Sequence, residues 1–364
     1  ARPGRDLRLS IDLRLQHLQH RELRRAVTAL GAASGTVVTL DSRTGEVLAM
    51  VNYPVYNPNK RGSADAAAMR NRAVTDVYEP GSTMKTLTLV AALESGRYTP
   101  DTLIDTAPGR IRVGRKTYVD PRDYGEITLT RAIQKSSQVG VTKIALDLGH
   151  EPIWEVFNRF GIGRPTGTGF PGESAGQLPN RPRWHATEKI SLAFGYGITA
   201  TPLQLASVYS ALANDGVQLP VSMLALQDEV PPGERVVDAR IAAQVMQVLH
   251  AVTGEHGTAG KARVPGYKVG GKTGTVHKVG RGGYLEDKYV ALFAGVAPVE
   301  DPRIVTVVVI NEPQGENYGG GSAAAPVFSA VTRGALRLLD VAPSEVRSEQ
   351  GEQQVATVAP GGAA

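Results

Sequence analysis

The chain has 364 residues, of which 41% are hydrophobic and 21% charged, with a formal net charge of +5 at pH 7. This composition indicates a globular protein with a sizeable core, and the mixing of basic with acidic residues argues against nucleic-acid binding. The sequence contains no cysteine and no run of about 18 apolar residues, which excludes disulfides, thiol nucleophiles, cysteine-ligated metals and a predicted membrane-spanning helix.

Patterns near the N-terminus predict a short strand, a helix and a β-hairpin. Residues 7–12 alternate between apolar and polar side chains, and leucines at helical spacing follow them. Two further segments, 34–41 and 45–51, are typical of hairpin strands and are joined by the turn residues Asp41–Gly45. A loop rich in proline and asparagine is expected over Tyr53–Arg61.

Apolar periodicity predicts helices in the middle of the chain and strands near its end. The helices are expected over Ser82–Glu94, Leu129–Leu148, Pro202–Asn214 and Asp238–Val252. After a glycine-rich segment that we expect to be mobile, 254–260, two apolar strands over 289–298 and 303–311 are joined by a turn. A last helix is predicted over Pro326–Leu339, and the polar residues 344–364 are expected to form a disordered tail.

The order of these elements predicts the fold class. Strands from both ends of the chain would form one mostly antiparallel sheet, and the helical segment between them, about 95–260, would be an insertion. Length alone suggests about two domains. The pattern nevertheless favours an α/β protein with one connected core over residues 1–343.

Residues 266–273, GYKVGGKT, fit the spacing of a phosphate-binding loop and also begin the motif K-T-G. A phosphate loop needs a buried strand before it and a helix after it, because the helix N-terminus binds the phosphate. Pro265 interrupts the preceding segment, and four glycines among residues 274–283 make the following one a poor helix. We therefore interpret the segment as a strand that runs into a loop. Nucleotide binding remains an alternative that an ATP titration tests.

Ser82-Thr-Met-Lys85 fits S-x-x-K, the first of three motifs shared by enzymes that penicillin acylates on a serine. The two residues share one face at the start of a predicted helix, so the amine can reach the hydroxyl. The helix N-terminus favours a forming oxyanion. Lys85 can act as a base if burial or a nearby cation, for which Lys272 is the candidate, lowers its pKa. The alternative for this motif alone is an ordinary helix cap beside a solvated lysine.

Residues Ser136-Ser137-Gln138 stand where a second motif is expected, downstream and near a helix start. Ser136 would relay a proton between Lys85 and a leaving nitrogen. Gln138 would donate its side-chain amide to a substrate carbonyl. A polar helix start without a catalytic role is the alternative.

The third motif is Lys272-Thr273-Gly274-Thr275, on a predicted edge strand in which Lys272 and Thr273 point to opposite faces. Gly274 would let a substrate backbone approach closely. The Thr275 hydroxyl would bond a carboxylate, while its N–H forms an oxyanion hole with that of Ser82. Lys272 would bind a carboxylate as a point charge. A glycine-rich turn with one exposed lysine is the alternative.

Three motifs in this order favour acyl transfer through a serine. With these residues placed, the chain resembles the transpeptidase domain of class B penicillin-binding proteins of the septal, cell-division type, from about Leu9 to about Pro343. The stretches that carry the resemblance are DVYEPGSTMK, AIQKSSQVGVTKIA, FGYGITATPLQLA, GKTGT, LFAGVAPVEDPRIVTVVVINEP and AAAPVF. It implies a serine β-lactamase-like fold, a mixed sheet flanked by helices with an inserted all-α subdomain.

The resemblance implies a peptidoglycan D,D-transpeptidase of septal cell-wall synthesis that needs no cofactor and is inhibited by β-lactams. Its serine attacks a D-Ala–D-Ala stem peptide and expels the terminal D-Ala, and an amine of a neighbouring stem peptide resolves the acyl-enzyme. Division proteins including a membrane glycosyltransferase are expected partners, at the periplasmic face of the inner membrane. We expect this chain, which begins at Ala1 and has no signal-peptide pattern, to be an excised catalytic part.

Carried over to this sequence, the resemblance makes Ser82 the nucleophile, Lys85 the base, and Ser136 and Gln138 the second motif. The residues implied to recognise the substrate carboxylate are Lys272, Thr273 and Thr275. Three tyrosines occupy positions like those of the family's substrate cleft, with packing as the alternative role: Tyr196, Tyr289 and Tyr318. The sequence departs from the family at Gln138, where asparagine is usual, and at Gly319, where some septal relatives carry an aromatic residue.

A serine β-lactamase and a non-catalytic β-lactam receptor are the competing functions. Class A β-lactamases need a glutamate that activates water, and Glu173, in a glycine-rich loop, is the one candidate. A receptor would be acylated without transferring the acyl group. The seven histidines form no metal-binding pattern, so we assign no metal. His277, beside K-T-G, is expected at the surface, with the cleft rim as the alternative.

Overall fold

The computed structural model describes residues 4, 6–63, 66–227, 229–280 and 282–344. At its centre lies a sheet in the order β2-β1-β11-β10-β9, in which every neighbouring pair is antiparallel. The strands are β1 (Ser34–Asp41), β2 (Val47–Tyr53), β9 (Gly270–Gly280), β10 (Gly283–Ala297) and β11 (Ile304–Asn311). The predicted α/β class is confirmed, as is an antiparallel sheet built from both ends of the chain.

Both predicted hairpins are present, and the pairing of β1 with β11 joins them. Val38 of β1 lies opposite Met50 of β2 on one side and opposite Val307 of β11 on the other. All eight residues of β1 are buried. A strand that is buried on both faces is mostly apolar or β-branched rather than alternating. Such runs are easy to recognise in the sequence, which is why the strands of this sheet were predicted.

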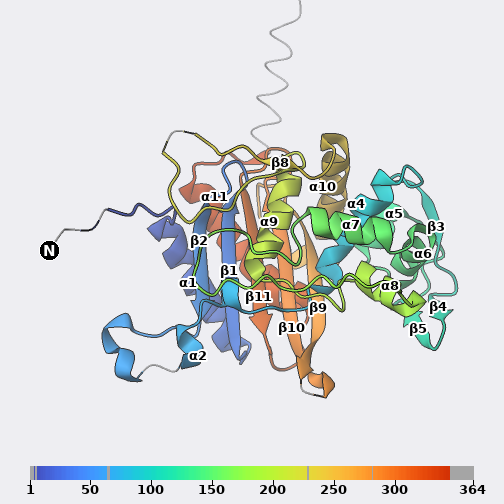
Figure 1. The fold of residues 1–364 in the computed structure, drawn as a ribbon, viewed down its shortest axis with the longest axis horizontal. Coiled ribbons are helices and arrows are strands. Elements are labelled where there is room, and N and C mark those ends of the chain that lie inside the picture. Colours follow the sequence, from blue (N-terminus) through green and yellow to red (C-terminus); the bar gives the residue numbers. More distant parts are fainter. Residues whose placement is uncertain (1–3, 5, 64–65, 228, 281, 345–364) are drawn as a thin grey trace, which may run out of the picture.

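Helices cover both faces of the sheet (Figure 1). α1 (Leu13–Ala29) and α11 (Ala325–Leu338) pack together on one face, and α9 (Pro202–Ala213) packs on the other. The inward stripe of α1 recurs at every fourth residue, as an amphipathic helix requires: Leu15, Gln19, Leu23 and Val27. α9 is buried along its whole length and therefore forms the centre of the core.

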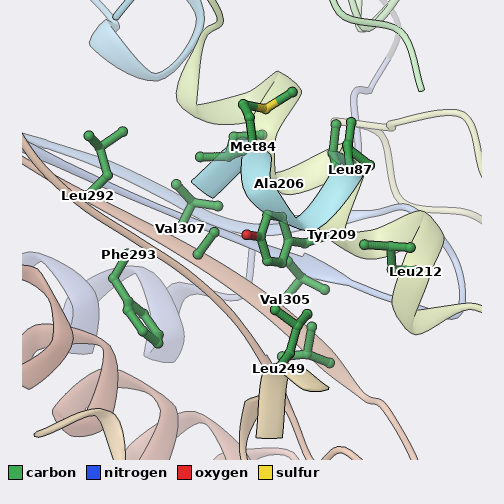
Figure 2. Packing of buried hydrophobic residues seen from close by; sticks show 14 of the residues in the cluster. Met84, Leu87, Ala206, Tyr209, Leu212, Leu249, Leu292, Phe293, Val305 and Val307 are labelled. Carbon is green, nitrogen blue, oxygen red and sulfur yellow. The ribbon is translucent and has the colours of Figure 1, made fainter. Parts of the chain in front are cut away.

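The buried side of α9 also fixes the segment that begins at Ser82. The hydroxyl of Tyr209 donates to the carbonyl of Thr83 at 2.9 Å and lies 2.9 Å from the hydroxyl of Thr86. Figure 2 shows Tyr209 among apolar side chains of the strands and of this segment, including Met84 and Leu87. A fully buried tyrosine needs partners for its hydroxyl, so these contacts tie the start of the segment to α9, which packs on the sheet.

Most of the elements between Lys85 and β9 gather beside the β9 edge of the sheet (Figure 1). The helices are α4 (Lys85–Glu94), α5 (Leu129–Gln134), α6 (Gln138–Leu148), α7 (Glu151–Arg159), α8 (Ala186–Ala193) and α10 (Ala239–Thr253). The short strands there are β3 (Leu103–Asp105), β4 (Arg110–Val113), β5 (Lys116–Val119) and β6 (Glu126–Thr128). The pair β7 (Val217–Gln218) and β8 (Glu234–Arg235) lies beside α9 instead. The insertion is thus mainly helical with small strand pairs. Because α9 and α10 contact the sheet, its boundaries at about 95–260 stay a prediction.

Several short elements complete the described residues. They are α2 (Ala66–Met69), α3 (Arg72–Thr75), the 3₁₀ turns η1 (Pro58–Ser63), η2 (Gly81–Met84) and η3 (Gly260–Ala262), and the π-helical η4 (Gly320–Ala324). Among the residues described, no helix is both long enough and apolar enough to cross a bilayer.

Three predicted elements differ in the structure. Residues 7–12 form no strand, because their pairing is limited to an isolated bridge between Leu9 and Leu224. The helix predicted from Ser82 begins with a 3₁₀ turn, and the helix predicted over Leu129–Leu148 is interrupted between α5 and α6. In the predicted C-terminal tail, residues 345–364 lie outside the described residues.

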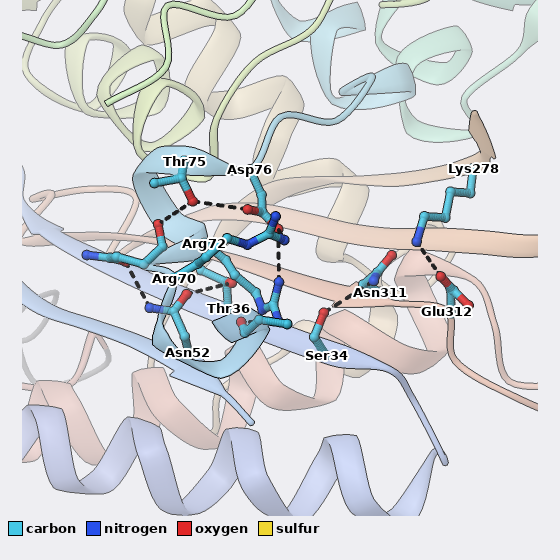
Figure 3. A network of polar contacts seen from close by, with 12 residues as sticks. Ser34, Thr36, Asn52, Arg70, Arg72, Thr75, Asp76, Lys278, Asn311 and Glu312 are labelled. Atoms are coloured by element: carbon cyan, nitrogen blue, oxygen red, sulfur yellow. Dashed lines mark hydrogen bonds and ion pairs between the residues drawn. The ribbon is translucent and has the colours of Figure 1, made fainter. Parts of the chain in front are cut away.

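A polar network anchors the chain between β2 and η2 (Figure 3). Asp76 accepts hydrogen bonds from Arg70 at 3.0 Å and from the buried Arg72 at 3.1 Å. The side-chain amide of Asn52 in β2 donates to Asn71 at 2.8 Å. These contacts hold the connection that carries the chain from the sheet to Ser82.

Candidate active site

Ser82 and Lys85 lie at the junction of η2 and α4 and open into one cavity of about 550 Å³. Gly81, just before Ser82, has a φ of +53°, and a Cβ there would lie 2.3 Å from Cγ1 of Val276 in β9. Only glycine therefore lets η2 pack this closely against β9. The predicted residues that line this cavity are Ser82, Lys85, Ser136, Gln138, Tyr196 and Thr275.

Lys85 is buried, with 2% of its surface exposed. Its Nζ donates to the carbonyl of Ser136 at 2.8 Å and lies 3.2 Å from the Ser136 hydroxyl. Burial lowers the pKa of Lys85 to about 7, and the carboxylate of Asp120 opposes that shift by favouring the charged form. A large share of Lys85 is therefore neutral at neutral pH, as a proton acceptor must be.

Ser136 stands in the break between α5 and α6, with a φ of +55°. This left-handed conformation costs about 1–3 kcal/mol in a non-glycine residue and is typical of functional sites. It turns the carbonyl and the hydroxyl of Ser136 towards Lys85. The hydroxyl also lies 3.1 Å from Nζ of Lys272, so that it bridges the two lysines.

Asp120 was not predicted as part of the site, and its hydrogen bonds fix the backbone of the second motif. Its carboxylate accepts hydrogen bonds from the hydroxyl of Ser137 at 2.6 Å and from the backbone N–H groups of Gln138 and Val139. Ser137 in turn caps α6 by accepting from the N–H of Gly140 at 2.9 Å. Asp120 stands 16 residues before Ser136, after a short strand, and no local pattern marks it.

Lys272 is fully buried in β9, and its Nζ donates to the Ser136 hydroxyl at 3.1 Å and to the Thr273 carbonyl at 3.2 Å. Burial, together with the nearby Lys85, lowers the pKa of Lys272 well below its usual value. The sequence prediction left two causes open for a lowered pKa of Lys85, burial or a nearby cation, with Lys272 as the candidate cation. In the structure the lowered pKa of Lys85 comes from burial, because the charged form loses its water. The repulsion between the two amines acts on Lys272, whose pKa the nearby Lys85 lowers further.

The other residues of the K-T-G motif lie on β9, the edge strand of the sheet, and have different surroundings. A Cβ at Gly274 would lie 3.0 Å from the Pro80 carbonyl oxygen, so this glycine admits the chain before Ser82. The Thr275 hydroxyl accepts from the N–H of Gly320 at 2.9 Å, which leaves its own hydrogen free to donate into the cavity. The Thr273 hydroxyl lies 3.3 Å from that of Thr258, and Thr273 does not line the cavity.

Of the three tyrosines predicted to lie in the substrate cleft, only one lines the cavity. Tyr196 lines the cavity. Tyr289 and Tyr318 do not; their rings stack at 4.2 Å between centroids, and Tyr289 contacts the ring of His277 at 4.6 Å. His277 is exposed and lines the cavity, so the stacked rings of Tyr289 and Tyr318 adjoin the cavity through His277. The exposure agrees with the predicted surface position of His277, and its place in the cavity wall agrees with the alternative.

Other cavity residues were not predicted as site residues, although Lys135 and Phe194 lie in stretches that carry the family resemblance. They include Lys116, Lys135, Ser191, Phe194 and Tyr284. They come from β5, the end of α5, the C-terminal part of α8 and β10, and their side chains meet only through the packing of these elements. Composition offered no signal for them, because an isolated lysine, serine or aromatic residue is common in any sequence.

The structure also bears on the alternatives. The segment after Lys272 is strand β9 rather than a helix, so the helix N-terminus that a phosphate loop needs is absent from this described segment. Glu173 accepts from the hydroxyl of Thr168 at 2.9 Å and from the N–H of Thr166 at 2.6 Å, which organises its own loop. Among the described residues, no cluster of three histidine or acidic side chains is arranged to hold a metal.

The pKa of Lys85 predicts how acylation depends on pH. With a pKa of about 7, the neutral, proton-accepting form grows from roughly one tenth at pH 6 to roughly nine tenths at pH 8. The second-order rate constant for acylation by a fluorescent penicillin is therefore expected to rise about tenfold over this range. A flat profile between pH 6 and 8 would contradict the assignment of Lys85 as the base.

Gln138 offers a milder test. It is exposed in the cavity, and its backbone N–H is held by Asp120. Because the backbone position does not depend on the side chain, we expect Gln138→Asn to move the amide by one methylene and to change the acylation rate by less than tenfold, or about 1.4 kcal/mol. A larger change in the measured rate means that the amide position is critical.

Ser82 lines one cavity with Lys85 and Ser136, and the Ser136 hydroxyl joins Lys85 to Lys272 of the edge strand. This arrangement defines a site for acyl transfer through a serine. Comparisons with known proteins agree with that class. Residues 35–333 match the family described as penicillin binding protein transpeptidase domain. The chain belongs to this family of penicillin-binding protein transpeptidases, and the fold and the sequence resemblance are confirmed.

Individual relatives place the chain further within the family. It is 43% identical to the peptidoglycan D,D-transpeptidase FtsI of Escherichia coli K12 over 94% of its length and 58% of that protein. It is 40% identical to the probable peptidoglycan D,D-transpeptidase PenA of Neisseria flavescens over 97% of its length and 87% of that protein. The solved transpeptidase domain of Burkholderia pseudomallei penicillin-binding protein 3 matches with a TM-score of 0.85 and 39% identity, over 94% of this chain and 99% of that one. The chain thus spans somewhat more than half of the E. coli relative.

Proposed function

We propose that this chain cross-links peptidoglycan stem peptides as a serine D,D-transpeptidase in septal cell-wall synthesis and that β-lactams acylate it. The observation that carries the proposal is the Ser136 hydroxyl, which lies within 3.2 Å of the amines of both buried lysines and lines one cavity with Ser82. The names of the relatives FtsI and PenA support the same activity.

The first half-reaction forms the acyl-enzyme. The Ser82 oxygen attacks the carbonyl between the two terminal D-Ala residues, and its proton passes to the neutral amine of Lys85. The N–H groups of Ser82 and Thr275 stabilise the oxyanion. The proton then moves through the Ser136 hydroxyl to the leaving nitrogen. The C–N bond breaks, and free D-Ala departs.

Substrate recognition follows from the charge of the buried pair. The terminal carboxylate of the donor binds the hydroxyl of Thr275 and the amine of Lys272. Because an opposite charge favours the protonated amine, the arrival of the carboxylate raises the pKa of Lys272. Binding therefore places the positive charge where it holds the substrate and leaves Lys85 neutral to act as the base.

The wider setting belongs to the proposal as well. Stem peptides and β-lactams are the proposed small partners, and division proteins including a membrane glycosyltransferase are the proposed macromolecular ones. The proposed location is the periplasmic face of the inner membrane, which the likeness to FtsI and PenA supports.

Mass spectrometry of the intact protein after treatment with penicillin tests the proposal. We expect one adduct, on the tryptic peptide Ala73–Lys85 that contains Ser82, with a lifetime of hours. Donor and amine acceptor together should then yield a cross-linked product. An adduct lost within a second would indicate a β-lactamase. A stable adduct without any transfer to an amine would indicate a receptor.

A further inference from the structure

A second cavity of about 530 Å³ adjoins the active-site cavity and shares part of its wall. The residues common to both are Lys116, Ser191, Tyr196 and Tyr284. We call the second cavity the side groove and define it by Arg115 and Lys116 on one side, Arg181 and Trp184 on the other, and Tyr196 and Tyr284 at the junction. A chain bound in the side groove can extend into the cavity that holds Ser82.

The side groove carries positive charge. Arg115 lines it from the turn between β4 and β5, Lys116 from the start of β5, and Arg181 from the loop before α8. Among its lining residues the one acid is Glu188, which pairs with Arg181. Within the described part of the chain, no ion pair occupies Arg115 or Lys116, both of which are exposed. These two cations are available to an anionic ligand.

Hydrogen bonds and an aromatic contact fix the side chains at the junction between the two cavities. The hydroxyl of Tyr284 donates to the carboxylate of Glu79 at 2.9 Å, and the N–H of Gly197 donates to the same carboxylate at 2.8 Å. The rings of Tyr196 and Tyr284 meet edge to face with centroids 6.4 Å apart. Glu79 therefore joins β10 to the end of α8 and holds two aromatic surfaces beside the passage to Ser82.

We propose that the side groove binds the acceptor of the transfer reaction, an anionic peptide that presents a primary amine to the acyl-enzyme. This inference rests on the proposed function. A two-substrate reaction needs a second chain to reach the acyl carbon after the terminal D-Ala has left Lys272 and Thr275 on β9, while the rest of the donor stays bound to Ser82 as the acyl group. The side groove enters the same cavity from the insertion, away from that strand.

Charge suits this ligand in two ways. Carboxylates of the peptide pair with Arg115 and Lys116 through charge-assisted hydrogen bonds. The same cations disfavour the protonated form of the incoming amine, which must be neutral to attack. The amine nitrogen bonds to the ester carbon, the bond from that carbon to the Ser82 oxygen breaks, and the proton of the amine passes through Lys85 to Ser82.

The test separates the two half-reactions in the protein as it is. Acylation is measured with a fluorescent penicillin. Transfer is measured with a D-Ala–D-Ala donor and a synthetic acceptor peptide that carries a free amine and two carboxylates, beside the same peptide with both carboxylates amidated. The variant is Arg115→Glu. Its matched control is Arg110→Glu, an exposed arginine of the same hairpin that does not line the side groove.

We expect Arg115→Glu to raise the half-saturating concentration of the dicarboxylate acceptor about tenfold, as expected when one charge contact is inverted. The half-saturating concentration of the amidated acceptor should change less than twofold. The rate of penicillin acylation should stay within twofold of the unmodified chain for both variants. Arg110→Glu should match the unmodified chain in every assay, and thermal unfolding checks that both variants are folded.

Three outcomes overturn the inference. An unchanged half-saturating concentration for the dicarboxylate acceptor means that Arg115 does not meet the acceptor. A slower acylation by the donor, with acceptor use unchanged, assigns the groove to the donor chain. Loss of transfer in the unmodified chain and in Arg110→Glu alike, with acylation intact, overturns the proposed transpeptidase function itself, and the inference with it.

Discussion

Ser82→Ala is expected to abolish covalent labelling by penicillin and to lower the rate of acyl transfer by at least about 10⁴-fold. The reason is that no bond to the acyl carbon can form without the serine oxygen. Ser82 is only partly buried at the start of η2, so the free energy of unfolding should change by less than about 0.5 kcal/mol. Gel fluorescence with a labelled penicillin and thermal unfolding measure the two quantities.

The cavity offers a matched control for this substitution. Ser191 lines the same space, and we expect Ser191→Ala to keep labelling. Residual labelling of Ser82→Ala at the rate of the unmodified chain would refute the nucleophile assignment. Loss of labelling in both variants, with both folded, would show that the assay reports the shape of the cavity rather than the identity of the nucleophile.

Lys85→Met is expected to slow acylation by roughly 10³-fold, the range in which a positioned general base contributes. Methionine has a similar length and suits the buried position that Lys85 occupies. The carbonyl of Ser136 loses its 2.8 Å donor, which costs about 1–3 kcal/mol of stability. The acylation rate constant, measured with a fluorescent penicillin in stopped flow, checks the first expectation.

The pH profile distinguishes a lost base from a disturbed cavity. The residual rate of Lys85→Met should lose the rise between pH 6 and 8, because the group with a pKa of about 7 is gone. Lys135→Met is the control, since Lys135 lines the same cavity and its Nζ donates to the carbonyl of His256 at 2.7 Å. Lys135→Met should keep the acylation rate of the unmodified chain and its increase between pH 6 and 8. If the rise persists without Lys85, another group is the base.

Short-range patterns determined much of this protein before any coordinates. The apolar strands β10 and β11 and the helices α9, α10 and α11 follow from periodicities of a few residues, which local sterics and burial impose on the chain. The three motifs are equally local, since a serine and a lysine three residues apart share a helix face wherever the helix lies. Their order along the chain indicated a serine acyl transferase, and the resemblance of further stretches, such as FGYGITATPLQLA and AAAPVF, indicated the family.

Local patterns failed where a distant contact overrides them. The continuous helix predicted over Leu129–Leu148 ignored Asp120, whose carboxylate takes the N–H groups at the start of α6 and thereby stabilises the break at Ser136. Thr273 shares a motif with Thr275, but only Thr275 faces the cavity. Sequence alone could not separate them, because β9 is positioned by its packing against η2 and η4.

The tertiary structure alone decided the electrostatics and the shape of the site. The pKa of an amine depends on how completely water is removed from it, and Lys85 and Lys272 lose their water only when α4, α6 and β9 close around them. The side groove likewise exists only because a hairpin, a loop and β10 meet beside Ser82. Desolvation and cavity shape arise from contacts between segments far apart in the chain, and no short stretch of residues records them.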